Sequence, residues 1–257
     1  METNMITQAV LAPDKKKAED VLHMIGQQIF ATDDRVYEFV NSNLRKLNTS
    51  IDIPINKSES NALLWGTFEE RTGRPIAGLL LYFYSWDKLR HQQYIQTYKS
   101  EGETCVICKS LQSIIEEEFE EEFNVTELQI AIEVGYLAIL KENRGKGWGS
   151  KILEEAYHNI LSQTTFQSPV LLFAIIMGKY ASTGYGELLM NEWFKLQESQ
   201  GNNSCTPLKS ILDKLGFPSD LFAINDNSIT SRVIAEKHEL KFVGYNKNTG
   251  SVFAKII

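Results

Sequence analysis

The stretch that most constrains the fold is residues 133–153, EVGYLAILKENRGKGWGSKIL. An apolar segment typical of a buried strand runs into a short polar bend, a glycine-rich turn and then a segment with helical spacing of apolar residues. Gly145, Gly147 and Gly149 alternate where the helix is expected to begin. Because glycine tolerates positive φ and close approach of a ligand to the main chain, this pattern predicts a strand–turn–helix unit with an accessible backbone.

The same unit has the features of a phosphate site. The first turn of a helix has unpaired N–H groups at the positive end of the helix dipole, and these attract anions. Arg144 and Lys146 add positive charge beside them. We therefore expect the main-chain amides from Arg144 to Ser150 to form a diphosphate cradle, with a glycine-rich turn that holds no ligand as the alternative.

Two common phosphate motifs fit this stretch poorly. The P-loop requires G-x-x-x-x-G-K-[ST], but the nearby order is reversed as Ser150-Lys151. The dinucleotide fingerprint requires G-x-G-x-x-G, whereas the glycines here fall at 145, 147 and 149.

The pattern Arg144-x-x-Gly147-x-Gly149, following such a strand, resembles the coenzyme A signature of the GNAT-type N-acetyltransferase superfamily. The segment 225–257 is similar to the C-terminal block of that family, in which an Asn-led helix leads into a Gly-Phe pair and a strand. Here Glu239-Leu240 stands where Gly-Phe would be expected. The resemblance covers roughly residues 61–85, 128–177 and 225–257 of the chain.

The resemblance implies an α/β (α+β) fold, with a GNAT-like, mixed, mostly antiparallel central sheet flanked by helices and two helical insertions. We expect a single GNAT-like domain over residues 1–257. Its parts are N-terminal helices (1–60), a hairpin (61–85), an insertion (86–126), the cofactor-binding core (127–177), a second insertion (178–224), and a C-terminal helix and hairpin (225–257).

Hydrophobic spacing predicts the individual helices. They are expected at Asp14–Phe30 with Asp14 as cap, Asp34–Leu47, Leu111–Phe123, around Glu187–Glu198, and around Pro207–Leu215. The helix after the cradle should turn Ile152, Leu153, Ala156, Ile160 and Leu161 inward, and the late helix Ile229, Val233 and Ile234. Glu198–Ser204 should be an exposed loop.

Residues 128–140 are apolar on both of their alternating faces, which predicts a central strand that is buried on both sides. The expected faces are Ile130, Ile132, Val134, Tyr136, Ala138 and Leu140 on one side, and Ala131, Glu133, Gly135, Leu137 and Ile139 on the other. Glu133 is the one charged residue of this strand.

The resemblance implies acetyl-CoA as acyl donor and no metal. It assigns cofactor contacts to Leu137, Ala138, Ile139, Arg144, Gly145, Lys146, Gly147, Trp148, Gly149, Ser150 and Asn227. The amide of Leu137 would polarise the thioester carbonyl, and such a donor is worth about 3 kcal/mol in a dry site. Asn225 is a near rival of Asn227, for which a plain helix cap is the alternative.

Amine acetylation needs a base, since an alkyl amine has a pKa near 10 and is mostly cationic at neutral pH. Glu133 lies eleven residues before Arg144, the spacing at which the histone-acetyltransferase branch of the family places its catalytic glutamate. Burial would raise its pKa toward a useful range. A strand glutamate paired with a cation or facing solvent is the alternative.

A general acid is harder to assign. In the family a late-helix Tyr often has this role, and its place is Ala235 here. Tyr180, Tyr185 and Tyr245 have no positional support and are more often packed aromatic residues.

Composition narrows the partners. A net charge of −7 argues against nucleic-acid binding, and no apolar run approaches the ~20 residues that span a bilayer. The first twenty residues lack the apolar core of a signal peptide, and three cysteines are too few for a disulfide scaffold. A cytoplasmic location is therefore expected, with the thiols reduced, although Cys105-Val-Ile-Cys108 has a metal-like spacing.

The leading interpretation is an N-acetyltransferase that acts on a primary amine of a small molecule or a polypeptide. A catalytically silent, CoA-binding GNAT-like module and a nucleotide-binding interaction protein are the alternatives. Glutamates at 116–118 and 120–122 form either a solvated face or a guide for a cationic acceptor. Neither nucleic acid nor membrane is an expected partner, and a homodimer is left open.

Overall fold

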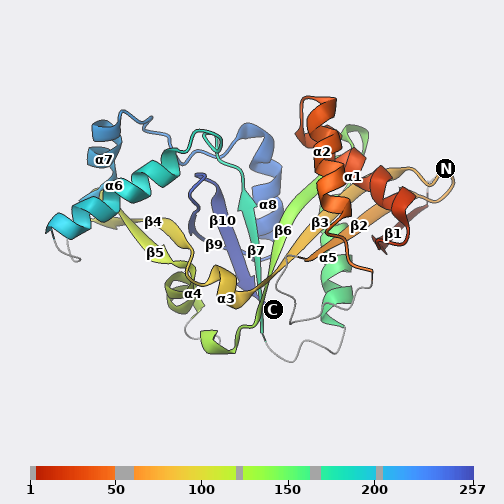
Figure 1. Cartoon of the computed structure of the whole chain (residues 1–257), viewed down its shortest axis with the longest axis horizontal. Coiled ribbons are helices and arrows are strands. Elements are labelled where there is room, and N and C mark those ends of the chain that lie inside the picture. Colours follow the sequence, from red (N-terminus) through yellow and green to blue (C-terminus); the bar gives the residue numbers. More distant parts are fainter. Residues whose placement is uncertain (1–3, 50–60, 120–123, 163–168, 201–204) are drawn as a thin grey trace. The chain divides into compact units, whose positions relative to one another are not determined.

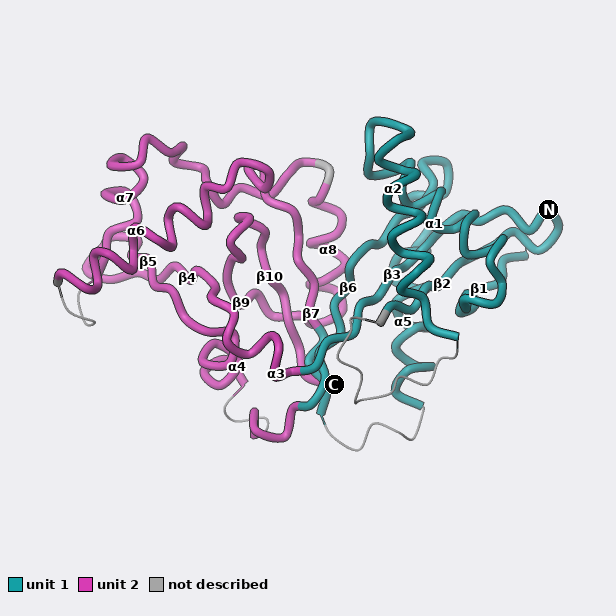
Figure 2. The backbone as a smooth tube through the Cα atoms, in the orientation of Figure 1, with its two compact units in different colours: residues 1–85, 129–172 teal, residues 86–128, 173–257 magenta. Residues whose placement is uncertain are grey.

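The computed structural model describes residues 4–49, 61–119, 124–162, 169–200 and 205–257. The chain divides into two compact units (Figure 2), unit 1 with residues 1–85 and 129–172, and unit 2 with residues 86–128 and 173–257. Residues 50–60, the glutamates at 120–122 and the loop residues 201–204 lie outside the described residues. The expectation of a single domain stays a prediction.

Four of the described strands of unit 1 pair in antiparallel fashion. They lie in the order β1 (Met5–Val10), β2 (Asn61–Glu69), β3 (Pro75–Ser85) and β6 (Ile130–Ile139), and β7 (Val170–Ile176) follows. The predicted hairpin is confirmed as β2 and β3. Strand β1 was not expected, because the N-terminal region was assigned to helices alone. It is a short edge strand whose Thr7 hydroxyl lies 3.0 Å from that of Thr67.

Helices cover the unit-1 strands. Helices α1 (Lys15–Ile29) and α2 (Asp33–Leu44) pack on one face through a core that includes Val21 and Ile25 (Figure 1). Asp14 accepts the Lys17 N–H at 3.4 Å and so caps α1, as predicted. A side chain at Gly78 would lie within 2.9 Å of Val21, so glycine allows α1 to pack closely here.

Helix α5 (Trp148–Leu161) contacts β1, β2, β3 and β6 but contributes no described residue to the α1–α2 core, which places it on the opposite face. Ile152, Leu153, Ala156 and Ile160 are buried as predicted. Leu161 is instead 47% exposed, because it is the last residue of the helix.

In unit 2 the strand order is β7, β10 (Ser251–Ile256), β9 (Lys241–Tyr245), β4 (Gln93–Ser100), β5 (Glu103–Ser110) and β8 (Thr206–Pro207). The first insertion is therefore not purely helical. Besides α3 (Trp86–Leu89), α4 (Leu111–Phe119) and the 3-10 turn Val125–Glu127, it contains the β4–β5 hairpin. Glu101 and Gly102 both take positive φ, of 51° and 85°, as tight hairpin turns require.

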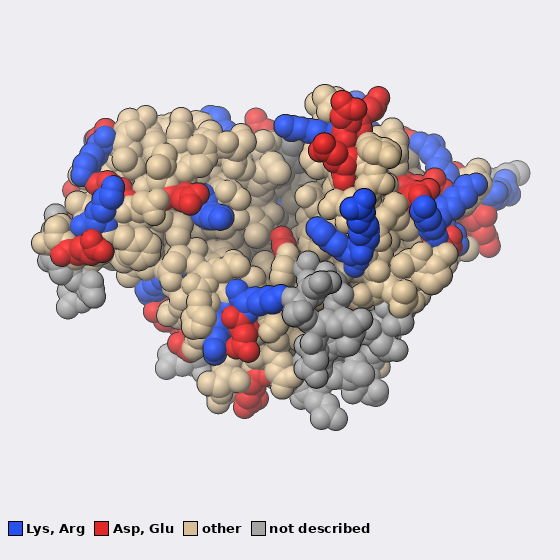
Figure 3. All heavy atoms as spheres, viewed as in Figure 1, with Lys and Arg blue, Asp and Glu red and all other residues tan. Residues whose placement is uncertain are grey.

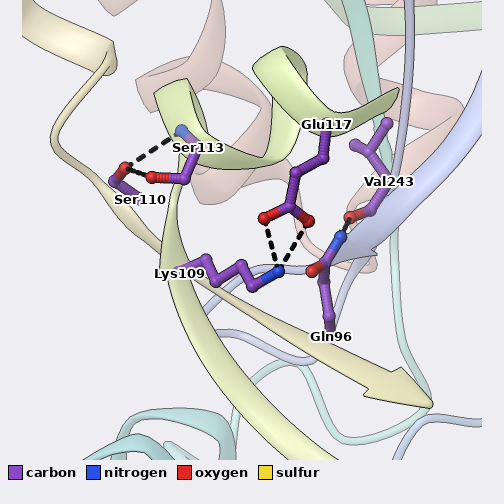
Figure 4. Close-up of polar contacts among 6 residues, drawn as sticks. All are labelled: Gln96, Lys109, Ser110, Ser113, Glu117 and Val243. Carbon is purple, nitrogen blue, oxygen red and sulfur yellow. Dashed lines mark hydrogen bonds and ion pairs between the residues drawn. The ribbon is translucent and has the colours of Figure 1, made fainter. Parts of the chain in front are cut away.

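Helix α4 is anchored beside this hairpin (Figure 4). Lys109 donates to both carboxylate oxygens of Glu117 at 2.6 Å, and the Ser110 hydroxyl accepts the Ser113 N–H at 3.1 Å. The Gln96 amide donates to the Val243 carbonyl at 3.2 Å, between β4 and β9. Lys109 thus neutralises one glutamate of the acidic helix, which supports a structural role for that residue.

The two expected insertions share one core. Helices α6 (Tyr185–Gln200) and α7 (Leu208–Leu215) supply Leu189, Met190, Ile211 and Leu212 to a buried cluster that also contains residues of β4 and β5. Trp193 on α6 donates its indole N–H to the Val106 carbonyl at 3.0 Å. Because α6 continues to Gln200, the predicted loop from Glu198 is wrong at its beginning.

A disulfide joins Cys105 on β5 to Cys205, just before β8, with 5.7 Å between the Cα atoms. The expectation that all three thiols are reduced is therefore wrong, and Cys108 is the remaining buried thiol. Burial raises the pKa of Cys108 to about 12, so it stays protonated. The cross-link connects parts of the chain 100 residues apart, a pairing that the Cys105–Cys108 spacing did not indicate.

The C-terminal helix and hairpin are α8 (Ile229–Lys237), β9 and β10. The predicted inward face is wrong for Ile229 and Val233, which are 53% and 57% exposed, whereas Ile234 is partly buried and Ala235 is buried. After α8, Glu239 takes φ 64° and the Leu240 N–H bonds the Ala235 carbonyl at 3.1 Å. Glu239 thus adopts the left-handed conformation that glycine usually takes after a helix.

The predicted fold class is confirmed, since the described residues form a mixed, mostly antiparallel ten-stranded sheet with flanking helices (Figure 1). Among the helices of the described segments, none has the length and apolar character needed to cross a membrane.

The Cys105–Cys205 cross-link generates a stability prediction. Because it closes a loop of 100 residues, its loss should lower the free energy of unfolding by about 2–4 kcal/mol. Adding dithiothreitol should therefore lower the Tm of the native protein in a thermal melt, but not that of the Cys205→Ser variant, which should already melt at the lower temperature. Equal sensitivity of the two proteins to the reductant would contradict the cross-link.

Candidate functional site

The glycine-rich loop lies between β6 and α5 in unit 1. After the 3-10 turn Lys141–Asn143, Gly145 takes φ 75° and Gly147, the N-cap of α5, takes φ 81°. The first helical bond runs from the Lys151 N–H to the Gly147 carbonyl at 3.1 Å, so the N–H groups of Trp148 and Gly149 precede it. The predicted strand–turn–helix unit is therefore present, with amide donors at the start of α5.

The space beside this loop is open. Apart from each glycine and its two neighbours in the chain, no described atom lies within 4 Å of the position that a Cβ would take at Gly145 or Gly147. Gly149 and Ser150 are instead buried in the first turn of α5, so only two of the three alternating glycines are exposed. An open loop with left-handed glycines and a helix N-terminus is the arrangement in which backbone amides bind phosphate.

The cations of the loop differ in their surroundings. Arg144 Nε donates to the Ile139 carbonyl at 3.2 Å and its Nη2 to Gln28 Oε1 at 3.0 Å, so this side chain joins the end of β6 to α1. Lys146 is exposed, and Lys151 Nζ lies 5.0 Å from the centre of the Trp148 ring. Of these groups, the exposed Lys146 is the one best placed to meet an anion from solvent.

A β-bulge at Gly135 changes the faces of β6. Tyr136 pairs with Leu80 and Val134 with Leu81, so Gly135 is the extra residue. The strict alternation expected from the sequence is therefore wrong, because one extra residue reverses the faces beyond it. Glu133, paired with Tyr82, consequently shares a face with Tyr136 rather than opposing it.

Gly135 is required by the packing around the bulge. A Cβ at this position would overlap the Tyr82 ring and lie 3.3 Å from the Leu80 carbonyl oxygen. Residues 133–137 are only partly buried, in contrast to the fully buried central strand that was expected. The middle of β6 thus keeps access to solvent at the position of its carboxylate.

Glu133 is a partly buried carboxylate with one phenol partner. Tyr84, on β3, donates its hydroxyl hydrogen to Glu133 Oε2 at 2.8 Å. Burial raises the pKa of Glu133, and the hydrogen bond from Tyr84 opposes that increase. The prediction of a burial-raised pKa is confirmed, whereas a role in catalysis stays a prediction.

Tyr82 and Tyr136, which interact electrostatically with Glu133, belong to a network of contacts that the sequence did not indicate. The Tyr82 hydroxyl donates to Asn43 Oδ1 at 2.7 Å, and Asn43 Nδ2 donates to the Phe39 carbonyl at 2.8 Å. The Tyr136 ring packs edge-on against Phe39 at 5.0 Å and against Tyr82 at 6.4 Å between centroids. Burial, together with the Glu133 charge, raises the pKa values of Tyr82 and Tyr136, so both phenols stay neutral.

The remaining expected site residues have the following places. Leu137, Ala138 and Ile139 end β6, opposite Leu79, Gly78 and Ala77 of β3. Asn227 lies in unit 2 within the 3-10 turn Asp226–Ser228, and the Ser228 N–H bonds the Asn225 carbonyl at 2.7 Å. The cofactor roles of all four residues stay predictions.

The structure offers no replacement for the missing general acid among the named tyrosines. Tyr180 donates to Asp220 at 2.8 Å, Tyr185 stacks on Phe217 at 4.3 Å, and Tyr245 stacks on Phe222 at 4.1 Å. These contacts are those of packed aromatic residues. Ala235 is buried and carries no proton to donate.

No cluster of three or more His, Cys, Asp and Glu side chains suited to a metal ion occurs among the described residues.

The bulge generates a prediction about stability. The Gly135→Ala substitution should lower the free energy of unfolding by about 1–3 kcal/mol, because the Tyr82 ring has to move. The measurement is urea unfolding in a double-mutant cycle with Tyr82→Ala. The cost of Gly135→Ala should be smaller in the Tyr82→Ala background, and an equal cost in both would rule out the ring as its cause.

The chain matches no protein-family model and no curated protein sequence. It is similar to the solved structure of arginine/ornithine succinyltransferase subunit AI from Pseudomonas aeruginosa, at 6% identity over 99% of this chain and 77% of that one, with a TM-score of 0.54. The Arabidopsis thaliana NAA60 complex with a bisubstrate analogue matches at 9% identity over 99% of both chains, with a TM-score of 0.44. A Brucella melitensis GNAT family acetyltransferase in complex with acetyl-CoA matches at 11% identity over 66% of this chain and 76% of that one, with a TM-score of 0.32.

At these identities the similarity concerns the fold and not the activity. Together with the strand order and the β6–loop–α5 unit, it shows that the chain has the GNAT-like fold that its sequence predicted.

Proposed function

We propose that this chain is a GNAT-type acyltransferase that transfers an acetyl group from acetyl-CoA to a primary amine. One observation carries the proposal. The strand that holds the partly buried Glu133 leads directly into an open loop with left-handed Gly145 and Gly147 at the start of α5. A base and an anion site on one continuous segment are what amine acylation by a phosphate-bearing donor requires.

The loop supplies the donors for the diphosphate of the acyl donor. Amides from Arg144 to Ser150 are the proposed contacts, and open space at Gly145 and Gly147 leaves room for a phosphate beside the main chain. The main chain of Leu137, Ala138 and Ile139 is proposed for the pantetheine arm, and the family resemblance assigns a contact with the cofactor to Asn227 as well. When bound, acetyl-CoA supplies a thioester as the electrophile, and the Leu137 amide would stabilise negative charge on its carbonyl oxygen.

Glu133 is the proposed general base. An acceptor amine arrives mostly protonated, and a carboxylate removes a proton from it only while the carboxylate is ionised. Because burial raises the pKa of Glu133, the group is a stronger base than an exposed glutamate once it is ionised. The expected pH profile therefore rises as Glu133 loses its proton.

The second candidate function is a catalytically silent module that binds CoA. The buried Ala235 favours it, because the late helix offers no acid for the leaving thiolate at the place where the family often has a Tyr. Acetyl-CoA binding without turnover over a broad panel of amines would favour the silent module. Competition between ATP and CoA for the loop would test the nucleotide-binding alternative.

The acceptor is proposed to be an amine of a small molecule or a polypeptide. In the view of Figure 3, Lys and Arg side chains are interspersed with Asp and Glu and do not form a continuous basic strip.

The acyl donor should be tested as well as the acceptor. One similar structure is named a succinyltransferase and another is a complex with acetyl-CoA, so the assays should include succinyl-CoA beside acetyl-CoA. The Cys105–Cys205 disulfide favours an oxidising compartment over the cytoplasmic location expected from the sequence, because such bonds persist mainly in oxidising compartments.

Binding of the acyl donor tests the loop. The Gly147→Ala substitution should weaken acetyl-CoA binding at least tenfold in calorimetry, because the new methyl group enters the open space beside the loop and an L-residue strains this φ. The matched control is Gly73→Ala, at φ 67° with equally open space but on the β2–β3 turn. Both variants should lose about 1–2 kcal/mol of stability, while only the first loses binding. Unchanged affinity in Gly147→Ala would remove the loop from the site.

Acylation kinetics test the base. The Glu133→Gln substitution should leave acetyl-CoA binding intact and lower kcat/KM for the amine by about 10²–10⁴-fold at neutral pH. The loss should shrink as the pH approaches 10, because more of the amine is then already neutral. Glu142→Gln, which removes an exposed carboxylate near the loop, is the control and should change the rate little. A fully active Glu133→Gln enzyme would exclude Glu133 as the base.

A further inference from the structure

We propose that Tyr84 is a positioning residue that holds one oxygen of Glu133, leaves the other oxygen for the acceptor amine, and thereby sets the pH range in which the base operates. This inference rests on the proposed function, in which Glu133 takes the proton from the amine. It adds a residue that neither the glycine-loop motif nor the family resemblance indicated.

The geometry assigns the two carboxylate oxygens different surroundings. Tyr84 Oη lies 2.8 Å from Glu133 Oε2 and donates its hydrogen there. A carboxylate oxygen that accepts a phenol hydrogen is less available to remove a proton, so Oε1 is the oxygen left to act as base. Tyr84 is next to the end of β3, and its backbone pairs with Ala131 across the ladder, which fixes the position of the phenol.

In the proposed step, one proton moves from the acceptor ammonium to Glu133. An N–H bond of the acceptor ammonium breaks, an O–H bond forms at Glu133 Oε1, and the neutral amine is left to attack the thioester. Tyr84 keeps its hydrogen throughout and stabilises the ionised carboxylate before that transfer. Without the phenol, burial alone would favour the protonated carboxyl, which cannot accept a proton.

The other groups near Glu133 do not take over this role. Tyr82 from β3 faces it across the ladder and donates to Asn43, and Tyr136 lies on β6 itself. Lys46, beyond the end of α2, lies 5.7 Å from the centre of the Tyr82 ring. The neighbouring strand β7 carries no titratable residue. Both further phenols are neutral in the range where a carboxyl titrates, because their own pKa values are raised.

The test compares Tyr84→Phe with Tyr82→Phe, two substitutions on the same face of β3 that each remove one phenol hydroxyl. In Tyr84→Phe the low-pH limb of the profile of kcat/KM against pH should move to higher pH by about one unit. The reason is that a charge-assisted hydrogen bond to the Glu133 carboxylate is lost. At a pH on that limb, kcat/KM should fall about tenfold, and it should recover at higher pH. In Tyr82→Phe the limb should stay in place.

A second readout separates this inference from the proposed function. The side-chain carboxyl carbon of Glu133, followed by ¹³C NMR in the protein without substrates, should titrate about one pH unit higher in Tyr84→Phe than in the native chain. An unchanged titration, or an equal shift in Tyr82→Phe, overturns the role of Tyr84. If the native protein acylates no amine, the proposed function fails on that result, and the titration still decides whether Tyr84 governs ionisation of Glu133.

Discussion

The contact on which the candidate site depends is the packing of the Tyr82 ring over Gly135. With no side chain at 135, the ring lies against the backbone and β6 accommodates one extra residue. The bulge turns Glu133 to the α1–α2 face, where Tyr84 and Tyr136 surround it. Without the bulge, either Glu133 or Tyr136 of β6 would point to the opposite face, and the carboxylate could not share a face with the Tyr136 ring.

Strand β6 and the loop that follows it have two different environments, one at Glu133 and one at the glycines. Its middle is partly buried and carries the carboxylate whose pKa burial raises. Its end leads into a turn where Gly145 and Gly147 leave open space at the start of α5. Arg144 fixes the junction by bonding the Ile139 carbonyl and Gln28 of α1. The partly buried carboxylate of Glu133 and the open glycine loop are thus held at a fixed separation along one chain segment.

Local features were predictable from the sequence, and non-local ones were not. Asp14 as a cap, the β2–β3 hairpin and the turn before α5 follow from residues next to one another in the chain. The bulge at Gly135 depends on register with β3, and the Cys105–Cys205 bond joins positions 100 residues apart. The phenol partner of Glu133 was missed for the same reason, because Tyr84 lies on a different strand. The β4–β5 hairpin was the avoidable omission, since a short connection with Gly102 separates two runs rich in β-branched and aromatic residues.

Glu239 and Ala235 both depart from the family pattern, but with different consequences. The backbone conformation is kept at Glu239, whereas a proton donor is lost at Ala235. At Glu239 the chain departs from the Gly-Phe pattern, yet the backbone takes the left-handed φ of 64° and Leu240 closes the helix end with a bond to Ala235. A non-glycine residue can adopt that conformation at a cost of about 1–2 kcal/mol, so the fold survives while the motif is lost. A proton donor has no such substitute, because the methyl group of Ala235 cannot protonate a thiolate. Under the proposed function, catalysis therefore depends mainly on Glu133 of β6, and the Tyr84 phenol that holds this carboxylate matters more than it would in an enzyme with a general acid of its own.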